Sequence, residues 1–321
     1  VMGRLKIVYP VCCGMDVHRD FLIACIAATN AQGVTEYQSR RFSTYTGSLR
    51  ELRDWLLAND CKDVCMESTG KYWFPVHNIL EESCHVVVSH PKFVKAIKGK
   101  KTDKKDAQWI ADLFKHDLVR GSFIPPKDIR QLRDLCRYWV KLSSYMTGEK
   151  NRAQNCLTVS NFKLDDVFSN VFGKSASAIT TQLLEHPGEQ FDVAPFVDGR
   201  CKTPIAQIQE AVDGIFTYEQ AEKLKIIRGH MDSLERHKAE LESLILEIAQ
   251  NYLPQIELLL TVPGIHDAFT AIRILAEIGA DMTVFDTSKH LCSWAGLTPQ
   301  NAESAGKKKT TRIGKSGAYL K

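Results

Sequence analysis

The spacing of hydrophobic positions divides the chain into a first part with short apolar runs and a second part with long helical repeats. In the first part, runs that are rich in aliphatic residues or alternate between apolar and polar residues predict β-strands. The five predicted strands occupy residues 11–17, 21–28, 34–42, 64–67 and 85–89. The second and third are joined by "NAQG", which is typical of a turn. This part is therefore predicted to contain a β-sheet.

Helical segments separate and follow the last strands. Ser43 or Thr44 is predicted to cap the helix before the fourth strand, because a hydroxyl side chain accepts a hydrogen bond from a free N–H at a helix start. A second helix is predicted at residues 72–82, and a third within "KTDKKDAQWIADLFKH". The apolar stripe of the third helix is formed by Ala107, Ile110, Ala111 and Phe114. The order βββαβαβα is that of the ribonuclease H-like fold.

Beyond Pro125 and Pro126, apolar residues recur at spacings of three and four, which predicts long helices with heptad seams. The first seam consists of Leu132, Leu135, Trp139, Leu142 and Met146. The second seam consists of Leu224, Ile227, Met231, Leu234, Lys238, Leu241, Ile245 and Ile248. Three arrangements are open: an antiparallel hairpin within the chain, a coiled coil between protomers, or an ordinary helical bundle. Between the seams, the mixed composition of residues 161–216 predicts an irregular, partly helical connector.

The end of the chain predicts a third region. Pro254 is expected to end the second long helix, and a Val-Pro-Gly-Ile turn at residues 262–265 then precedes an amphipathic helix. This turn resembles a helix-hairpin-helix turn, in which backbone N–H groups can contact a phosphate. The predicted fold class is thus α/β plus α. The predicted domains are a mixed-sheet domain at 1–124, a coiled-coil or helical region at 125–253, and a small, mainly helical domain at 254–321.

Positive charge is concentrated in two short stretches, although the whole chain has a net charge of only +4. Seven lysines and two aspartates lie from Pro91 to Asp106, and six basic residues with no acidic one follow Gly306. Local basic stretches predict contact with a polyanion at defined places, whereas a solvated lysine-rich surface is the alternative. The candidate nucleic-acid contacts are Lys100, Lys101, Lys104, Lys105, Lys307, Lys308, Lys309, Arg312 and Lys315.

The chain contains ten cysteines, whose spacing favours neither disulfides nor a metal site. Cys12 and Cys13 are adjacent, while Cys61 and Cys65 have no matching second pair. Structural zinc is not expected, because a zinc site needs closely paired ligands. Scattered cysteines in a long chain instead predict reduced thiols and a cytoplasmic protein. No stretch reaches the roughly 20 apolar residues that span a bilayer, so no membrane association is expected.

Four carboxylates from three elements form the main candidate site. Asp16 ends the first strand and Glu67 the fourth, and these strands are neighbours in a ribonuclease H-like sheet. Asp103 and Asp106 are three residues apart on a helix and therefore face one side. Such a cluster repels itself unless cations bind, so we predict two Mg²⁺ ions roughly 4 Å apart that bracket a scissile phosphate. Taken singly, the same residues could be a turn residue, helix caps or first-turn acids.

Several motifs together resemble those of a known family, the DEDD transposases of insertion sequences of class one-hundred-ten. The N-terminal motifs are "GMDVH", "MESTGKYW" and "KTDKKDAQWIADL", and the C-terminal one is "SWAGLTPQNAESAGKKKTTRIGKSG". The resemblance spans nearly the whole chain. It implies a RuvC-like nuclease domain, a coiled-coil insertion and a C-terminal transposase domain. By motif position, it implies that Asp16, Glu67, Asp103 and Asp106 are the catalytic acidic set and that Ser304 is the essential serine.

The resemblance further implies Mg²⁺-dependent DNA recombination in the bacterial cytoplasm, at the nucleoid. The implied partners are double-stranded DNA at the element ends and target, a structured noncoding guide RNA called the bridge RNA, and a homo-oligomer, either a dimer or a tetramer. In that assembly one subunit's carboxylates would join another's serine, and Ser304 would attack the DNA phosphate and hold the strand covalently. Taken alone, Ser304 could be a polar loop residue, because a serine hydroxyl is a poor nucleophile unless it is activated.

Two other functions are open from the residues. A RuvC-like structure-selective endonuclease would keep the carboxylates and use metal-activated water instead of a serine. A non-enzymatic nucleic-acid-binding protein would combine the long helices with an inert sheet domain. RNA binding is implied by the resemblance alone, because no signature of the RRM or KH type is visible in the sequence.

Overall fold

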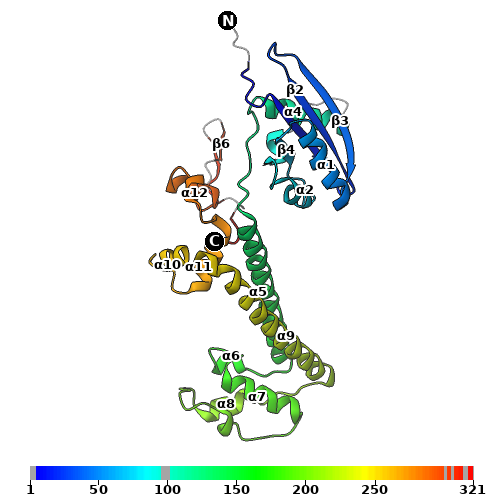
Figure 1. Cartoon of the computed structure of the whole chain (residues 1–321). Coiled ribbons are helices and arrows are strands. Elements are labelled where there is room, and N and C mark those ends of the chain that lie inside the picture. Colours follow the sequence, from blue (N-terminus) through cyan, green and yellow to red (C-terminus); the bar gives the residue numbers. More distant parts are fainter. Residues whose placement is uncertain (1–4, 95–101, 300–301, 305–306, 314–316, 321) are drawn as a thin grey trace. The chain divides into compact units, whose positions relative to one another are not determined.

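The computed structural model describes most of the chain (Figure 1), with gaps near the basic stretches and at both ends. The described residues are 5–94, 102–299, 302–304, 307–313 and 317–320, and for 302–304 and 307–310 only the backbone is described. The chain divides into two compact units, unit 1 (Val1–Ile124) and unit 2 (Pro125–Lys321). Each unit is described separately.

Unit 1 contains the five strands that the sequence predicts, with boundaries that differ by at most one residue. They are β1 (Val11–Val17), β2 (Phe21–Thr29), β3 (Thr35–Ser43), β4 (Asp63–Glu67) and β5 (His85–Ser89). Their order in the sheet is β3-β2-β1-β4-β5. The first three strands are antiparallel neighbours, whereas β4 and β5 run parallel to β1. This mixed sheet confirms the predicted ribonuclease H-like fold.

Helices cover both faces of this sheet. The helices are α1 (Thr46–Ala58), α2 (Trp73–Leu80), α3 (Pro91–Val94) and α4 (Asp103–Lys115). Alternate residues of β1 point to opposite faces. Cys13 and Met15 therefore pack in one cluster with residues of α1 and α2. Cys12 packs in another cluster with Ile110, Ala111 and Phe114 of α4. The face that carries α4 is called the α4 face.

The predicted cap of the first helix is wrong. Tyr45 is the N-cap of α1, and it makes no side-chain capping hydrogen bond. The Thr44 hydroxyl instead donates to the carbonyl of Arg19, and the Ser43 N–H donates to the Ser48 hydroxyl. Hydroxyl side chains bond to whichever backbone or side-chain group lies near, so a Ser-Thr pair does not by itself identify the N-cap.

The cysteines are free thiols, and eight of the ten are buried. Burial raises the pKa of Cys12 and of Cys65, each to about 12, because an apolar surrounding disfavours the thiolate. The predicted absence of disulfides agrees with this arrangement. Cys201 and Cys292 are the two cysteines that are partly exposed.

Brief alkylation with iodoacetamide at pH 7.5 is expected to modify Cys201 and Cys292 and to leave the other eight cysteines unmodified. The reason is that the thiolate is the reactive form, and burial both blocks access and opposes ionisation. Mass spectrometry of tryptic peptides measures the modification of each thiol, with a sample in guanidinium as the control in which all ten react. Rapid modification of Cys12 or Cys65 in the native protein would contradict the described packing of the sheet.

In unit 2, two long helices pack against each other within the chain. They are α5 (Lys127–Val159) and α9 (Tyr218–Ala249), seen side by side in Figure 1. Leu157, near the end of α5, packs in one cluster with Leu224, near the start of α9. Leu132 of α5 packs in another cluster with Ile245 of α9. The helices are thus antiparallel, and the structure shows the hairpin among the arrangements that the sequence left open.

Polar seam positions also find partners across this hairpin. The Trp139 indole N–H donates to Oε1 of Glu242 at 2.6 Å, and the Lys238 ammonium lies 4.6 Å from the centre of the Trp139 ring. The second seam therefore tolerates a lysine, because its charge faces an aromatic ring and solvent.

The segment 161–216 is more ordered than the predicted connector. It forms α6 (Leu164–Val167), α7 (Lys174–Glu185), the 3₁₀ turn η1 (Ala194–Phe196) and α8 (Ile205–Ala211) at the end of the hairpin (Figure 1). Phe162, Ile179 and Ile208 are fully or almost fully buried in its core. The helices are short and interrupted by proline and glycine, so their apolar period is hard to detect in the sequence.

The region after α9 begins differently from the prediction. Helix α9 ends at Ala249, before Pro254, and a 3₁₀ turn η2 (Gln250–Tyr252) follows. Pro254 lies in the first turn of α10 (Leu253–Leu260), where proline is favoured because it needs no hydrogen-bonded N–H there. It therefore starts a helix and does not end one.

The remaining elements are α11 (Ala268–Ile278), η3 (Met282–Val284), α12 (Ser288–Trp294) and a hairpin of β6 (Ala302–Ser304) with β7 (Lys307–Thr310). Helix α11 contacts α5 through a partly buried ion pair, in which Glu277 is buried and Arg137 is partly exposed. Both guanidinium nitrogens of Arg137 that face Glu277 lie 2.7 Å from its carboxylate oxygens. Residues 125–321 form one unit, so their division at residue 253 stays a prediction. Among the described residues, no helix is long and apolar enough to cross a membrane.

Candidate functional site

The candidate site lies where helix α4 crosses the end of strand β1. Gly14 of β1 faces α4, and a Cβ atom at this position would lie 2.3 Å from both the Ala107 carbonyl oxygen and the Ala111 nitrogen. Side chains do not approach backbone atoms this closely. The missing side chain of Gly14 therefore allows the two backbones to come together, two residues before Asp16.

Asp16 and Asp103 are brought together by this close packing. Asp16 is half-buried and lies on the α4 face, because side chains alternate along β1 from Cys12 through Gly14. Asp103 is the first residue of α4, after the N-cap Thr102, whose hydroxyl accepts from the Lys105 N–H. Ligand atoms of Asp16, Asp103 and a third residue, His18, all lie within 4.8 Å of one another.

His18 is the functional candidate that sequence reasoning missed. Its Nε2 lies 3.1 Å from Oδ2 of Asp16 and 3.7 Å from Oδ1 of Asp103. The signal in the sequence was its place two residues after Asp16, in "MDVH". That spacing alone did not indicate that the chain turns after β1 and brings the imidazole back over the carboxylates.

Asp106 lies close enough to influence this group but is not part of it. Burial raises the pKa of Asp16 above its ordinary value, the His18 imidazole opposes this rise, and the charges of Asp103 and Asp106 add to it. The predicted self-repulsion of the carboxylates is therefore present at Asp16. Asp103 and Asp106 both lie in the first turn of α4, as predicted.

Glu67 lies at the neighbouring strand end but outside the compact group. Met66 of β4 pairs with Met15 of β1, so Glu67 is in register beside Asp16. Cys65 packs under α4, and alternation places Glu67 on the α4 face as well. However, Oε1 of Glu67 accepts a hydrogen bond from the Thr69 hydroxyl at 2.8 Å, and Glu67 is not in the group formed by Asp16, His18 and Asp103.

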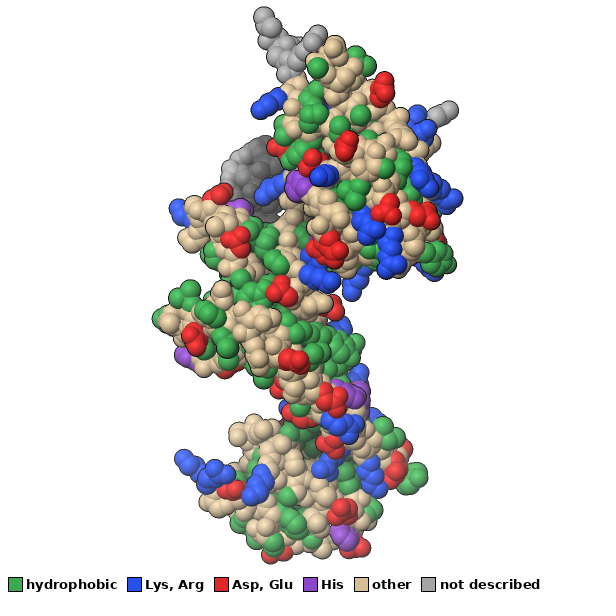
Figure 2. Space-filling model, viewed as in Figure 1, with side chains coloured by type: hydrophobic (Ala, Val, Ile, Leu, Met, Phe, Trp, Pro, Cys, Tyr) green, Lys and Arg blue, Asp and Glu red, His purple; other side chains and the backbone are tan. Residues whose placement is uncertain are grey.

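The predicted basic contacts are only partly described. Lys104 and Lys105 are exposed in the first turn of α4, and Arg312 is exposed in unit 2. Lysine and arginine side chains are interspersed with acidic ones on the part of unit 1 in view in Figure 2. Lys100, Lys101 and Lys315 lie outside the described residues. For Lys307, Lys308 and Lys309 the backbone of β7 is described and the side chains are not.

Ser304 ends strand β6, and its backbone pairs with that of Lys307 in the β6–β7 hairpin. The described part of the chain does not include its side chain. The acidic residues belong to unit 1 and Ser304 to unit 2, so each is placed within its own unit.

The donor atoms of the carboxylate group suit a divalent cation. Asp16 and Asp103 supply the carboxylate oxygens that Mg²⁺ prefers, and a bound cation would remove the repulsion between them. Glu67 and Asp106 border this position and could complete or extend the ligand set. The imidazole of His18 would also allow Mn²⁺, which accepts nitrogen ligands.

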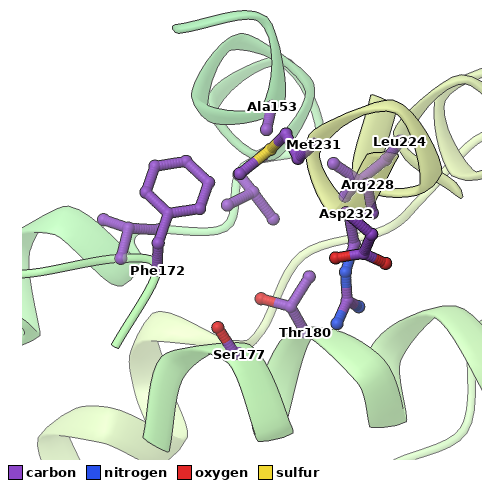
Figure 3. Close-up of a pocket in the computed structure, with 10 residues that line it drawn as sticks. Ala153, Phe172, Ser177, Thr180, Leu224, Arg228, Met231 and Asp232 are labelled. Carbon is purple, nitrogen blue, oxygen red and sulfur yellow. The ribbon is translucent and has the colours of Figure 1, made fainter. Parts of the chain in front are cut away.

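Unit 2 contains a separate cavity of about 190 Å³ between α5, α7 and α9 (Figure 3). Phe172 and Met231 line its apolar side, while Ser177 and Thr180 line a polar side. The guanidinium of Arg228 donates to the Thr181 hydroxyl, so this cation already has a partner. None of the predicted site residues lines the cavity.

Two family models match the chain. One, described as a transposase and named for the DEDD transposases of IS110, matches residues 13–161. The other, described as the transposase IS116/IS110/IS902 family, matches residues 256–320. The chain belongs to the IS110 family of DEDD transposases. This transposase is therefore an enzyme that cleaves and recombines DNA, and its family chemistry depends on a divalent metal. The predicted family is confirmed.

No curated protein matches the transposase. Among solved structures, RuvC of Thermus thermophilus is 14% identical over 35% of this chain and 99% of its own, with a TM-score of 0.29. RuvC of T. thermophilus in complex with Holliday junction substrate is 13% identical with the same coverage and a TM-score of 0.27. A Fowlpox virus resolvase with substrate Holliday junction DNA is 14% identical over 32% of this chain and 72% of its own, with a TM-score of 0.23.

Proposed function

We propose that this transposase of an insertion sequence cleaves and exchanges DNA strands with Mg²⁺, with Ser304 as the nucleophile and a bridge noncoding RNA as the guide. The observation that carries the proposal is the group of Asp16, His18 and Asp103, whose ligand atoms lie within 4.8 Å at the end of β1. Glu67 and Asp106 lie beside this group and make up the remainder of the DEDD set.

Each candidate ligand has a distinct task in this proposal. Asp16 and Asp103 would hold the Mg²⁺ ion. When bound, the ion would neutralise negative charge at the scissile phosphate and polarise the reacting oxygens. Asp106 and Glu67 would bind a second ion or orient the first. The Nε2–H of His18 donates a hydrogen bond to Oδ2 of the Asp16 carboxylate, and so it orients that carboxylate before the metal binds.

The serine step is proposed from the motif and the hairpin. The Ser304 oxygen would form a bond to phosphorus while the bond from phosphorus to the leaving sugar oxygen breaks. The serine hydroxyl loses its proton in this step, and the leaving oxygen gains one. Lys307 and its neighbours in β7 follow Ser304 after two intervening residues, and the backbone of Lys307 pairs with that of Ser304, which supports binding of the flanking phosphates. The covalent bond keeps the energy of the phosphodiester available for rejoining.

The partners of the proposal extend beyond one chain. The DNA substrates are the element ends and the target, in the bacterial cytoplasm at the nucleoid, and the active form is a homo-oligomer, a dimer or a tetramer. Exposed apolar side chains on α10, including Leu253 and Leu258, support association with another copy of the chain.

Asp16→Asn is expected to reduce DNA strand cleavage by at least about a thousandfold, because losing several kcal/mol of charge stabilisation has that effect on a rate. The measurement uses the full-length protein, RNA transcribed from the flank of its element, labelled DNA with an element end and a target, and Mg²⁺. Asp20→Asn is the matched control, because Asp20 is exposed and pairs only weakly with Arg19 at 3.4 Å. Equal cleavage by Asp16→Asn and the wild type would overturn the carboxylate site.

The same assay tests the serine and the guide. Ser304→Ala is expected to remove the covalent protein–DNA adduct on a denaturing gel and to stop strand exchange. The alternative function is a RuvC-like structure-selective endonuclease that uses metal-activated water, and it is favoured by the location of all four candidate carboxylates in unit 1. Cleavage by Ser304→Ala at the wild-type rate supports that alternative, and full activity without the RNA removes the guide from the proposal.

A further inference from the structure

An arginine on the edge strand β3 lies on the same face of the sheet as the carboxylate group. Arg41 pairs with Ile23 of β2. Phe42, the next residue, is buried with α1 and α2 on the opposite face. Tyr37, four residues before Arg41, donates a hydrogen bond to Asp112 of α4 at 2.6 Å. Because side chains alternate along a strand, Arg41 shares the α4 face with Tyr37.

Three contacts in series connect Arg41 to the carboxylates. The guanidinium carbon of Arg41 lies 4.1 Å from the centre of the Phe21 ring. The Phe21 ring centre lies 4.7 Å from that of His18. Nε2 of His18 in turn lies 3.1 Å from Asp16. Arg41, Phe21 and His18 therefore form a row of planar groups that extends from β3 to the candidate metal site.

Arg41 has the chemistry of a phosphate ligand. Its side chain is exposed, and no acidic side chain within the described part of the chain forms an ion pair with it. A guanidinium carries several N–H donors in one plane, which match two oxygens of a phosphate. Stacking on Phe21 restricts the orientation of this plane before a ligand arrives, so less entropy is lost on binding.

A second cation borders the same surface. Lys104 is close enough to Cys25 of β2 that its charge acts on the pKa of that thiol. Cys25 pairs with Ser39 of β3, two residues before Arg41. Lys104 and Arg41 thus place positive charge over β2 and β3, next to the carboxylate group. The carboxylates repel a polyanion, so nearby cations are needed for it to bind there.

The distance from Arg41 to the metal site suits a nucleic-acid backbone. Strand β3 is the second neighbour of β1 in the sheet, which corresponds to about 10 Å at the usual strand spacing. Successive phosphates of one DNA strand lie roughly 6–7 Å apart through space, because the strand turns around the helix axis while it rises about 3.4 Å per nucleotide. Arg41 is therefore placed to contact a phosphate about one to two nucleotides from one that lies at Asp16 and Asp103.

We propose that Arg41, held against Phe21, binds a backbone phosphate of the DNA strand whose scissile phosphate occupies the carboxylate site, and so positions that strand for cleavage. This inference rests on the proposed function, because it takes DNA as the occupant of the site. The cleaved DNA strand would therefore run from the carboxylate site across β2 to β3, which lie on the side of β1 opposite to β4.

Arg40 provides a matched control. It is the preceding residue, it is exposed, and its guanidinium also lies over an aromatic ring, at 4.8 Å from the centre of Phe42. Alternation along β3 places it on the opposite face of the sheet, away from α4 and the carboxylates. Arg40→Ala and Arg41→Ala therefore remove the same charge and the same kind of contact from the two faces.

The test measures binding of a fluorescent duplex carrying an element end to the full-length protein with EDTA, so that no cleavage occurs. Arg41→Ala is expected to weaken binding about tenfold and to reduce the slope of log K against log salt by about 0.9, which corresponds to one lost phosphate contact. Arg41→Lys should recover part of the affinity. Phe21→Leu, which keeps the charge but removes the ring, should weaken binding about threefold. Arg40→Ala should match the wild type in both affinity and slope.

Ethylation interference on the cleaved strand locates the contact. The wild type is expected to show interference at a phosphate about one to two nucleotides from the scissile one, and this signal should disappear in Arg41→Ala. Equal DNA affinity and salt slope for Arg41→Ala and Arg40→Ala would overturn the inference, as would a loss confined to binding of the flank-derived RNA. Cleavage by Asp16→Asn separates the two proposals: if that variant is inactive while Arg41→Ala binds DNA normally, the inference about Arg41 fails and the proposed function stands.

Discussion

Gly14→Ala is expected to destabilise unit 1 by about 3 kcal/mol or more and to abolish DNA cleavage. The added Cβ would lie 2.3 Å from two backbone atoms of α4, the Ala107 oxygen and the Ala111 nitrogen. Backbone atoms inside a helix cannot rotate away as a side-chain end can. Helix α4 must therefore shift from β1, and the shift moves Asp103 away from Asp16.

Urea denaturation and the cleavage assay measure the two effects of this substitution. Gly47→Ala is the control, because a Cβ at Gly47 meets no atom within 4 Å and the residue lies in helix α1, where alanine is favoured over glycine. That variant should be as stable as the wild type or slightly more stable, with unchanged cleavage. If Gly14→Ala retained both stability and activity, the close packing of α4 on β1 could not be what holds the carboxylates together.

Raising the pH from 8 to 10 is expected to lower the stability of unit 1 by several kcal/mol. Six of its cysteines have a pKa raised mainly by burial, namely Cys12, Cys13, Cys25, Cys61, Cys65 and Cys84. A raised pKa in the folded state means that the folded chain holds protons which the unfolded chain releases. The stabilisation is fully present below the ordinary thiol pKa of 9.0 and is lost as the pH rises toward the folded value.

The size of the alkaline effect follows from proton linkage. A thiol whose folded pKa lies well above 9 costs about 1.4 kcal/mol by pH 10, so the four thiols with the largest rise, Cys12, Cys13, Cys61 and Cys65, together cost about 5–6 kcal/mol. This is comparable to the whole stability of a typical domain, which is about 5–15 kcal/mol. Scanning calorimetry of the full-length protein with a reductant, at several pH values from 7 to 10.5, should show a steep fall of the first unfolding transition.

Single cysteine variants test the origin of this alkaline effect. Cys65→Ala is expected to reduce the pH dependence by about one quarter, which is about 1.4 kcal/mol at pH 10, although it also lowers stability at neutral pH through lost packing. Cys201→Ala removes a thiol that is not buried and should leave the dependence unchanged. A first transition that stays constant up to pH 10 would show that the thiols of unit 1 titrate alike in the folded and unfolded chains.

Local patterns predicted the regular elements well where the elements are periodic. Strands β1 and β5 have the predicted bounds, Val11–Val17 and His85–Ser89, because short aliphatic runs between polar segments are a property of the sequence itself. The long helices α5 and α9 were predicted for the same reason. The errors lie where a residue can take either of two local roles and the surrounding structure selects one. Thr44 donates to the Arg19 carbonyl instead of capping α1, and Pro254 begins α10 instead of ending α9.

The sequence by itself determined the strand order along the chain, the heptad seams, the four acidic candidates and the family motifs, because each of these is encoded in residue type and spacing. Only the tertiary structure decided that the seams pair within one chain, that Gly14 lets α4 touch β1, and that His18 and Arg41 lie on the side of the acidic group. These features depend on which backbones pack face to face, and chain segments as far apart as Gly14 and Ala111 carry no local signal of that contact. Close packing of distant segments, and not their separate patterns, therefore assembles the site.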